Sequence, residues 1–429
     1  MVKEFDIVVF GATGFTARHI CKELQRTSST LQRPIRWAIA GRSMNKLNEL
    51  AETLQPKPDI LIADVHDEKS LVEIFSRSHV CIDAVGPYAL WGEPVVRACI
   101  KAKCDYLDVT GEPQYVSNML LKYNEEAKNA GVTIVHCCAF DSVPADIGIL
   151  YAKRAFQERG WTPTQVESYC RLITERKKVS IHFGTFYSAV EFMASPIAHF
   201  QTLRRAHQSL PKIKYLGPHL LLKLWPRYES KVKGWVLPMP LDPIIVWLSQ
   251  RIYARNHQPR EEDQAIQPPV IPPVQYMGYV VFPSLLNILQ MLILGAVVGL
   301  FSLLPFTRSL LKKHPEKFTM GVFTHQGPTQ EEIANLRVHM VFFTRGYETR
   351  DAVMEDVTTL NRSLITTVDG GEPAYVITSQ SAVQCAYTLL LERDKVPRGV
   401  HLPSSAFSET SLVERLDKAG LKFQVQEQK

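Results

Sequence analysis

Residues 5–17 read FDIVVFGATGFTA, and this stretch decides the fold class. Residues 5–10 form a short apolar run rich in β-branched side chains, which predicts a buried strand. The run opens directly into a tight turn at residues 11–14, and residues 18–26 then follow a helical pattern. A strand, a glycine turn and a helix in this order place backbone N–H groups where they can bind a phosphate.

The alternation of strand and helix continues beyond this unit. Further strands are predicted at residues 36–40, 60–63, 80–85, 106–109 and 132–135, with helices at residues 70–76, 93–101 and 118–130 and one ending near residue 54. Strands that alternate with helices at this spacing form a parallel sheet. We therefore predict an α/β fold with a Rossmann-type doubly wound parallel sheet over residues 1–150.

The regular alternation of strands and helices ends after about residue 160. Aromatic and β-branched runs at residues 167–173 and 180–186 predict an antiparallel sheet, and a less regular, Pro-rich stretch follows. We expect a second, mixed α/β domain over residues 151–370, including a hydrophobic segment at residues 276–307. The C-terminal segment, residues 371–429, completes the chain.

The glycine turn has the spacing G-x-x-G-x-x-A, with Ala17 where a third glycine usually lets the helix pack on the strand. An ordinary βα turn is the alternative, but the strand, the helix and two more βα units are all in place, as a dinucleotide site requires. The residues predicted to bind the dinucleotide at this turn are Gly11, Ala12, Thr13, Gly14 and Phe15.

Residues at three further strand ends complete the predicted cofactor site. Arg42 follows the second strand, where an acid would select NAD and an arginine suits a 2′-phosphate, so we expect NADP rather than NAD. The alternative is a solvated strand-end arginine. Asp64 could accept from the adenine amino group or cap the next helix, and Gly86 and Pro87 would pass beneath the nicotinamide ribose.

Other enzyme classes lack their motifs in this chain. No tyrosine has a lysine four residues later, so the acid of the short-chain dehydrogenases is missing. There is no Ser-His-Asp motif, no His-Glu-x-x-His helix and no Walker sequence, which excludes the familiar hydrolase and nucleoside-triphosphatase patterns.

What remains resembles the saccharopine dehydrogenase-like oxidoreductases over nearly the whole chain. The matching stretches are VVFGATGFTA (8–17), AGRS (40–43), VGPYALWGEPVVRAC (85–99), YLDVTGE (106–112), AFDSVPAD (139–146) and GVHLPSSAF (399–407). The resemblance implies a Rossmann domain, an intervening mixed α/β domain and a C-terminal segment that returns to the first domain. It does not transfer the substrate, because we can assign no basic set that would hold a tricarboxylate.

Hydride transfer to an imine or carbonyl needs a bound cofactor and one general acid or base. Asp141, Asp108 and Glu112 follow strand ends where the substrate cleft should form, and we take Asp141 as the candidate catalytic residue. The alternative is that Asp141 only caps the helix that begins near Pro144. Tyr88 could stack near the nicotinamide or simply line the wall.

Residues 264–307 contain no charged residue, and residues 285–304 are apolar except for Asn287, Gln290 and Ser302. As a helix, the second stretch would span roughly 30 Å, the thickness of the hydrocarbon core of a bilayer. A single crossing would separate the C-terminal segment from the Rossmann domain that the resemblance says it rejoins. We therefore expect a monotopic insertion or a helix buried in an oligomer interface, such as a homodimer.

The net charge of +6 is concentrated in residues 203–233, which hold eight Lys and Arg residues against one acid. So localised a patch argues against a general nucleic-acid binder. Apolar residues are interleaved at residues 220–225, which favours a surface of anionic lipid headgroups. The alternative is a solvated basic face beside a buried helix.

The N-terminal residues MVKEFD carry acids and no long apolar run, so we expect no signal peptide. Eight scattered cysteines without a C-x-x-C pair indicate a reducing compartment. These patterns, with the resemblance, predict a protein on the cytosolic face of lipid droplets or endomembranes. Its predicted partners are a dinucleotide and a lipid surface.

Two functions fit the sequence. One is an NADP-dependent oxidoreductase acting on a lipid-associated or amino-acid-derived substrate. The other is a non-catalytic lipid-surface binding or scaffold protein that retains a dinucleotide-binding fold.

Overall fold

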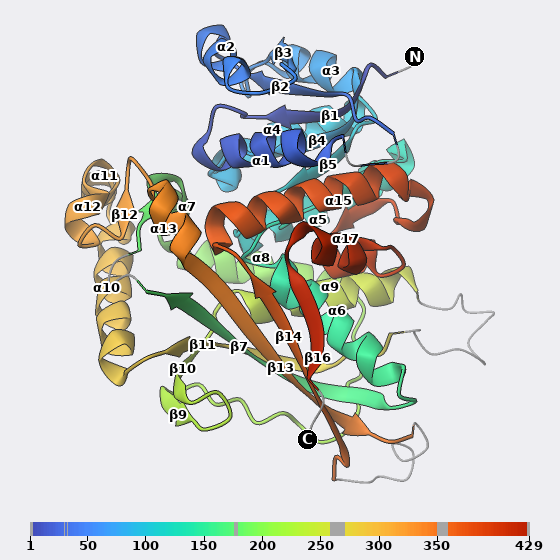
Figure 1. Cartoon of the computed structure of the whole chain (residues 1–429), viewed down its shortest axis with the longest axis vertical. Coiled ribbons are helices and arrows are strands. Elements are labelled where there is room, and N and C mark those ends of the chain that lie inside the picture. Colours follow the sequence, from blue (N-terminus) through green and yellow to red (C-terminus); the bar gives the residue numbers. More distant parts are fainter. Residues whose placement is uncertain are drawn as a thin grey trace.

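The computed structural model describes residues 3–29, 31, 33–175, 179–257, 271–349 and 359–426. It has two lobes, each built around a seven-stranded sheet, with the first lobe at the top in Figure 1. A third, two-stranded sheet joins β8 (Ile181–His182) to β12 (Phe323–Thr324).

The first sheet is entirely parallel, with the strand order β15-β6-β5-β4-β1-β2-β3. Its strands are β1 (Phe5–Phe10), β2 (Trp37–Gly41), β3 (Asp59–Ile62), β4 (Ser78–Asp83), β5 (Asp105–Asp108), β6 (Thr133–Val135) and β15 (Gly399–His401). The chain winds outward from β1 to β3 and then from β4 to β6, so the order reverses between β1 and β4. The predicted Rossmann-type fold is confirmed, and its switch point is where such sheets bind ligands.

Helices cover both faces of the first sheet. They are α1 (Phe15–Thr27), α2 (Met44–Glu52), α3 (Glu68–Ser76), α4 (Tyr88–Lys101), α5 (Pro113–Ala130) and α6 (Val143–Gln157). Helices α1 and α2 share one apolar core with α6, and helices α3, α4 and α5 share the core on the opposite face.

The second sheet has the order β16-β14-β13-β7-β11-β10-β9. Its strands are β7 (Thr162–Thr174), β9 (Arg227–Glu229), β10 (Gly234–Pro238), β11 (Gln275–Phe282), β13 (Leu336–Tyr347), β14 (Arg362–Gly370) and β16 (Lys422–Gln426). Strands β7 and β11 run parallel and the other pairs antiparallel. The expected antiparallel sheet is therefore a mixed sheet.

The prediction of a strand at residues 180–186 is wrong for most of its length. Only Ile181 and His182 are in a strand, and α7 (Phe183–Met193) begins immediately after them. Phe186 and Val190 lie one helical turn apart and bury the same face, in a cluster with Val298 and Leu311. The aromatic run thus follows the period of a helix, not of a strand.

Helix α6 connects the two lobes. It shares the core with strands of both sheets, and its Gly148 lies against the Phe342 ring of β13. A Cβ at Gly148 would lie 2.5 Å from the Phe342 Cζ atom, so only glycine allows this approach.

The last part of the chain contributes to both sheets. Strand β15 pairs in parallel with β6 of the first sheet, and β16 pairs with β14 of the second sheet. The remaining elements of this part are η2 (Pro373–Ile377), α15 (Thr378–Leu391), η3 (Arg393–Lys395), α16 (Pro403–Phe407) and α17 (Leu412–Ala419). Helix α15 packs beside α1 on the first sheet (Figure 1).

The charge-free segment forms α10 (Leu285–Leu303), which lies on the outside of the second lobe (Figure 1). Of its side chains, only Ile288, Val298 and Ser302 are buried. The other helices of this lobe are α8 (Pro196–Ser209), α9 (Asp242–Asn256), α11 (Pro305–Lys313), α12 (Pro315–Phe318) and α13 (Gln330–Asn335). The strands before and after α10, β11 and β13, belong to the same sheet. The chain therefore leaves this sheet to form α10 and then returns to it.

Candidate functional site

The glycine turn joins β1 to α1 at the carboxyl edge of the first sheet. Gly11 has a φ of +76°, and a Cβ there would lie 2.6 Å from Val85 Cγ2 at the end of β4. The N–H groups of Gly11 and Ala12 both donate to the Ala40 carbonyl, which fixes the turn against β2. Gly14 is the N-cap of α1 and offers no capping side chain, so the first-turn N–H groups are left for an anion. This arrangement fits the pyrophosphate of a dinucleotide.

The side chain of Phe15 contacts the second lobe. Its ring stacks on His182 with centroids 4.7 Å apart, and it meets Tyr375 edge-on at 4.8 Å. The Tyr375 hydroxyl accepts from the His182 backbone N–H. The aromatic cluster therefore holds β8 and η2 over the glycine turn, a role that the sequence did not indicate for these residues.

The ends of β2 and β3 carry the two groups predicted to recognise the nucleotide. Arg42 is exposed, and no carboxylate pairs with it among the residues that the structure describes. Asp64 accepts from the His66 N–H at 3.0 Å, whereas Asp67 is the residue that caps α3. The capping alternative for Asp64 is therefore wrong.

Gly86 and Pro87 follow β4. Gly86 is exposed at the sheet edge, and a Cβ on it would lie 3.9 Å from Ser188 Oγ of α7, so the second lobe faces this end. Tyr88 is buried, and its hydroxyl donates to the Asp83 carbonyl at 3.0 Å. Its ring therefore supports β4 from inside and is not placed to stack on a ligand.

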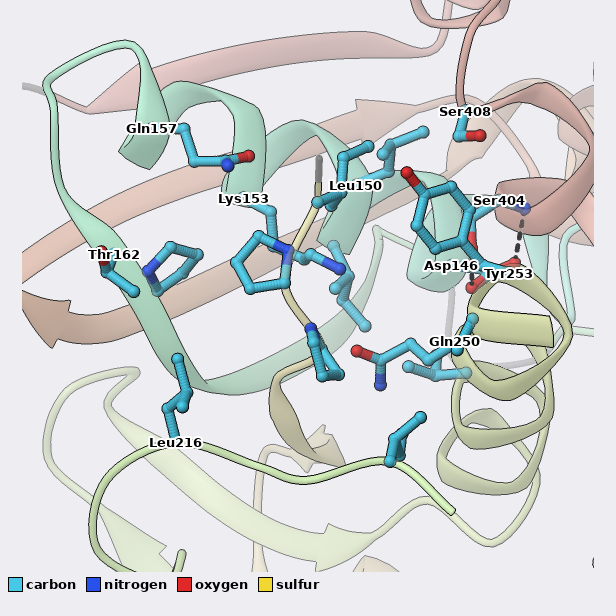
Figure 2. A pocket seen from close by; sticks show the side chains of 18 of the residues that line it. Asp146, Leu150, Lys153, Gln157, Thr162, Leu216, Gln250, Tyr253, Ser404 and Ser408 are labelled. Atoms are coloured by element: carbon cyan, nitrogen blue, oxygen red, sulfur yellow. Dashed lines mark hydrogen bonds between the residues drawn. The ribbon is translucent and has the colours of Figure 1, made fainter. Parts of the chain in front are cut away.

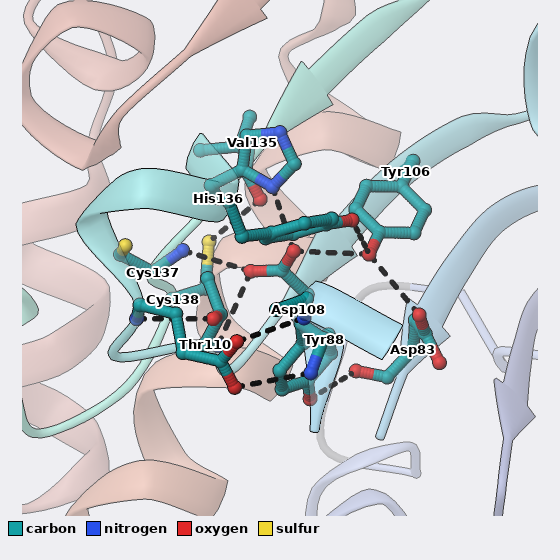
Figure 3. A network of polar contacts seen from close by, with 12 residues as sticks. Asp83, Tyr88, Tyr106, Asp108, Thr110, Val135, His136, Cys137 and Cys138 are labelled. Atoms are coloured by element: carbon teal, nitrogen blue, oxygen red, sulfur yellow. Dashed lines mark hydrogen bonds and ion pairs between the residues drawn. The ribbon is translucent and has the colours of Figure 1, made fainter. Parts of the chain in front are cut away.

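Asp108 lies in a fully buried polar network (Figure 3). Its Oδ2 lies 2.6 Å from His136 Nδ1, and its Oδ1 accepts from the Cys137 N–H at 2.9 Å and from the Thr110 N–H at 3.3 Å. These contacts tie the end of β5 to the end of β6. The expectation that Asp108 faces the substrate is wrong, because its carboxylate is used inside the protein.

The Tyr106 hydroxyl lies 2.9 Å from Asp108 Oδ2 and 3.1 Å from Asp83 Oδ2. A single hydroxyl proton cannot serve two carboxylates. Burial raises the pKa of Asp83 well above its usual value, and the nearby Asp108 adds to the shift. The raised pKa favours the protonated form of Asp83, and that form reduces the repulsion between the two acids.

Glu112 is also internal. Its carboxylate accepts from the backbone N–H groups of Tyr88 and Ala89 at 3.0 and 2.8 Å, at the N-terminus of α4. Burial raises the pKa of Glu112, and these hydrogen bonds oppose the shift. Its position is that of a helix-capping group between two strand ends, not of a group facing a substrate.

Asp141 differs from these carboxylates because its side chain is exposed. It precedes α6, but the N-cap of that helix is Ser142 and no side-chain capping bond is present. A Cβ on Gly111 would lie only 2.8 Å from Asp141 Oδ2. The Asp141 side chain therefore packs against the segment that follows β5. Desolvation by the surrounding protein raises the pKa of Asp141. The capping alternative is not supported, and Asp141 is exposed to solvent, unlike the buried Asp108 and Glu112.

A second acid, Asp242, is one that the sequence did not indicate. It is the first residue of α9, is 5% exposed, and has no hydrogen-bond donor on its carboxyl within the described part of the chain. Burial raises its pKa to about 8, with smaller contributions from Asp141 and then Asp146. The sequence Leu-Asp-Pro resembles an ordinary helix start, so only its burial beside other acids distinguishes it.

The structure thus brings the glycine turn, Gly86 and the residues after β5 and β6 to one edge of the sheet. It places Arg42 and Asp64 at the ends of the neighbouring strands on the other side of β1. No cluster of three or more potential metal ligands occurs among the described residues.

Comparison with known proteins gives a consistent picture. The family model for the saccharopine dehydrogenase NADP binding domain matches residues 7–135. A human saccharopine dehydrogenase-like oxidoreductase is 35% identical over 99% of this chain and 97% of its own length. A lipid droplet localized protein of Caenorhabditis elegans is 29% identical over 99% of each chain.

Among solved structures, the apo saccharopine dehydrogenase (L-Glu forming) of Saccharomyces cerevisiae has a TM-score of 0.56 at 13% identity. The match covers 99% of this chain and 100% of that one. At this identity, the likeness supports the fold alone.

The raised pKa of Asp242 predicts a pH-dependent stability. An acid that binds its proton more tightly when folded stabilises the fold fully below its unfolded pKa, near 3.8, and loses this contribution as pH rises toward 8. Asp242→Asn should therefore gain stability relative to wild type between pH 4 and pH 8, by a few kcal/mol. Urea unfolding of both proteins across this range measures the difference.

The matched control is Asp394→Asn, which changes an exposed carboxylate on η3. Its difference from wild type should not vary with pH. A constant difference for Asp242→Asn as well would show that Asp242 ionises normally in the folded protein.

Proposed function

Because the chain belongs to the saccharopine dehydrogenase-like oxidoreductase family, we propose that it transfers hydride between NADP(H) and a carbonyl or imine substrate at a lipid surface. The proposal rests mainly on the uncapped first turn of α1, together with Arg42 at the end of the neighbouring strand β2, which is exposed and pairs with no carboxylate among the described residues. The family model is that of an NADP-binding domain, so NADP is the cofactor of this fold.

Different residues of the chain would bind different parts of the cofactor. The first-turn N–H groups of α1 bind the pyrophosphate, and Arg42 binds the 2′-phosphate. Asp64 accepts from the adenine, while the backbone at Gly86 and Pro87 supports the nicotinamide ribose. The bound cofactor supplies or accepts a hydride at C4 of its nicotinamide.

Asp141 is the group proposed to hold the proton. A carbonyl or imine that accepts a hydride also needs a proton, and a general acid gives it most readily when its pKa lies near the working pH. Desolvation raises the pKa of Asp141, and its exposed side chain is free of a capping duty. Asp141 in turn contributes to the negative field that favours the protonated form of the buried Asp242.

The cofactor site predicts a selective loss on removing Arg42. Arg42→Ala should lower the affinity for NADPH by about tenfold or more, because a charge-assisted bond to phosphate is lost, and should leave NADH unchanged. Isothermal titration calorimetry with both cofactors measures this. Arg33→Ala is the control, because Arg33 pairs with Asp6 at the opposite, amino end of β1. Equal losses in the two variants would contradict the assignment.

The proton-holding role predicts a separation of binding from turnover. With whichever of a series of long-chain aldehydes, ketones and imines supports NADPH oxidation, Asp141→Asn should lower kcat by about 10²- to 10⁴-fold. NADPH affinity should stay unchanged, and wild-type kcat should fall on the alkaline side as Asp141 loses its proton. An unchanged kcat would exclude Asp141. Bound NADPH that no substrate oxidises would favour the scaffold alternative.

The lipid-surface part rests on α10. This helix is long and apolar enough to cross a membrane, yet only 17% of its most apolar window is buried in the protein. Its buried face packs on α7 and α11, and most of its other side chains, including Leu289 and Leu300, are exposed. Helix α10 is therefore not a buried helix, and it offers a continuous apolar surface.

Neighbouring elements extend this surface. Helix α8 lies against α10 across a groove lined by Phe200 and Leu300, and it exposes Ile197 as well. The basic residues Arg204 and Arg205 follow on the same helix. The apolar side chains can enter the acyl region of one leaflet, and the basic residues next to them can contact its anionic headgroups. A relative named as lipid droplet localized supports this choice over a homodimer interface.

The insertion predicts loss of lipid binding on adding charge to α10. Leu292→Asp with Leu300→Asp should abolish flotation of the full-length protein with vesicles containing phosphatidylserine, because two carboxylates cannot enter the acyl region. High salt should weaken binding of the wild type without abolishing it. Leu121→Asp with Leu391→Asp is the control, because both residues are exposed on the first lobe. A folded α10 variant that still floats would contradict the insertion.

A further inference from the structure

A pocket lies between α6, α9 and the start of β7, away from the glycine turn (Figure 2). Its volume is about 460 Å³, within the range of small-molecule sites. Much of its wall is apolar and comes from Ile149, Leu150, Val246 and Ile271. No residue of the glycine turn, or of the strand ends beside it, lines this pocket. The pocket therefore has no part in the cofactor site described above.

Lys153 of α6 is the group that distinguishes this pocket. Figure 2 shows its side chain extending into the pocket, although the residue is only 6% exposed. Among the described residues, no carboxylate lies within 4 Å of its Nζ and no acceptor is hydrogen-bonded to it. A buried ammonium without a partner is costly, so such a group is retained where a ligand can pair with it.

The nearest acid does not fill this role. Asp146, about two turns earlier on α6, accepts from the Ser404 N–H at 2.7 Å, from Ser404 Oγ at 2.7 Å and from Ser249 Oγ at 2.8 Å. These three donors satisfy its carboxylate and hold it against α9 and α16. Lys153 is thus left facing the pocket.

We propose that this pocket binds a monocarboxylate with an apolar chain, the carboxylate pairing with Lys153 and the chain lying along the apolar wall. One buried, unpartnered amine matches one singly charged head group, and the second charge of a phosphate would meet no other buried cation among the residues that line the pocket, because Lys214 is exposed. The amide of Gln250 lines the same pocket and has its Nε2 and Oε1 engaged with Val274, so it stiffens the wall.

The charges around Lys153 support a pH-dependent affinity. Burial lowers the pKa of Lys153 to about 7, and Asp146 opposes the shift. The other titratable groups that line the pocket are Asp146 on α6, whose pKa burial raises to about 6, Tyr253 on α9, raised to about 12, and the exposed Lys214. A bound carboxylate needs the protonated amine, so affinity should fall as pH rises above 7.

The test uses decanoate and decanol as probes on the full chain, by isothermal titration calorimetry without a nicotinamide cofactor. We expect wild type to bind decanoate at least about tenfold more tightly than decanol at pH 7. Lys153→Met should remove this preference and keep decanol binding. Between pH 7.5 and pH 9, wild-type affinity for decanoate should fall roughly twentyfold, and that of Lys153→Met should stay constant.

Two measurements make the result decisive. Lys153→Met should unfold at a higher temperature than wild type, because it removes a buried unpaired charge, so loss of binding will not reflect misfolding. Lys214→Met removes an equal charge at the rim of the pocket and should bind decanoate like wild type. Equal affinity for decanoate and decanol in wild type, an unchanged preference in Lys153→Met, or no binding of either probe would overturn the proposal. None of these outcomes bears on NADPH binding.

Discussion

Helix α6 has to bury both of its sides, and the rest of the structure depends on this constraint. The first sheet's core lies against one side and strands of the second sheet against the other. The close contact of Gly148 with the Phe342 ring sets how near the two sheets can come. The same helix follows Asp141 at the edge of the first sheet and carries Lys153 in a pocket further along. One element therefore positions both candidate binding regions.

The acids near the carboxyl edge of the first sheet differ in the hydrogen-bond donors that hold their carboxyl groups. Asp108 and Glu112 are held by backbone N–H groups, and Asp83 shares a tyrosine hydroxyl with Asp108. Such bonds offset the cost of burying a carboxylate and fasten the strand ends together. Asp141 and Asp242 lack them, so desolvation raises their pKa values with little to oppose it. Among the described residues, the lack of hydrogen-bond donors thus sets Asp141 and Asp242 apart from these other acids.

The charge-free segment is an insert in the second lobe. Strands β11 and β13 on either side of it belong to one sheet, and β12 pairs with β8 close by. A helix anchored in this way cannot leave the rest of the chain on the far side of a bilayer. It can present an apolar face to one leaflet, which is the geometry that the proposed lipid association requires.

The sequence by itself determined the Rossmann half, because glycine spacing and the strand period are local patterns that few other folds can satisfy. It did not reveal the helix at residues 183–193, because the helical spacing of Phe186 and Val190 became evident only once their shared burial was known. Only the tertiary structure decided which acids are internal. It alone brought Phe15 to His182 and left Lys153 without a partner among the residues that the structure describes. Burial and pairing depend on segments far apart in the chain, and no local pattern of residues records them.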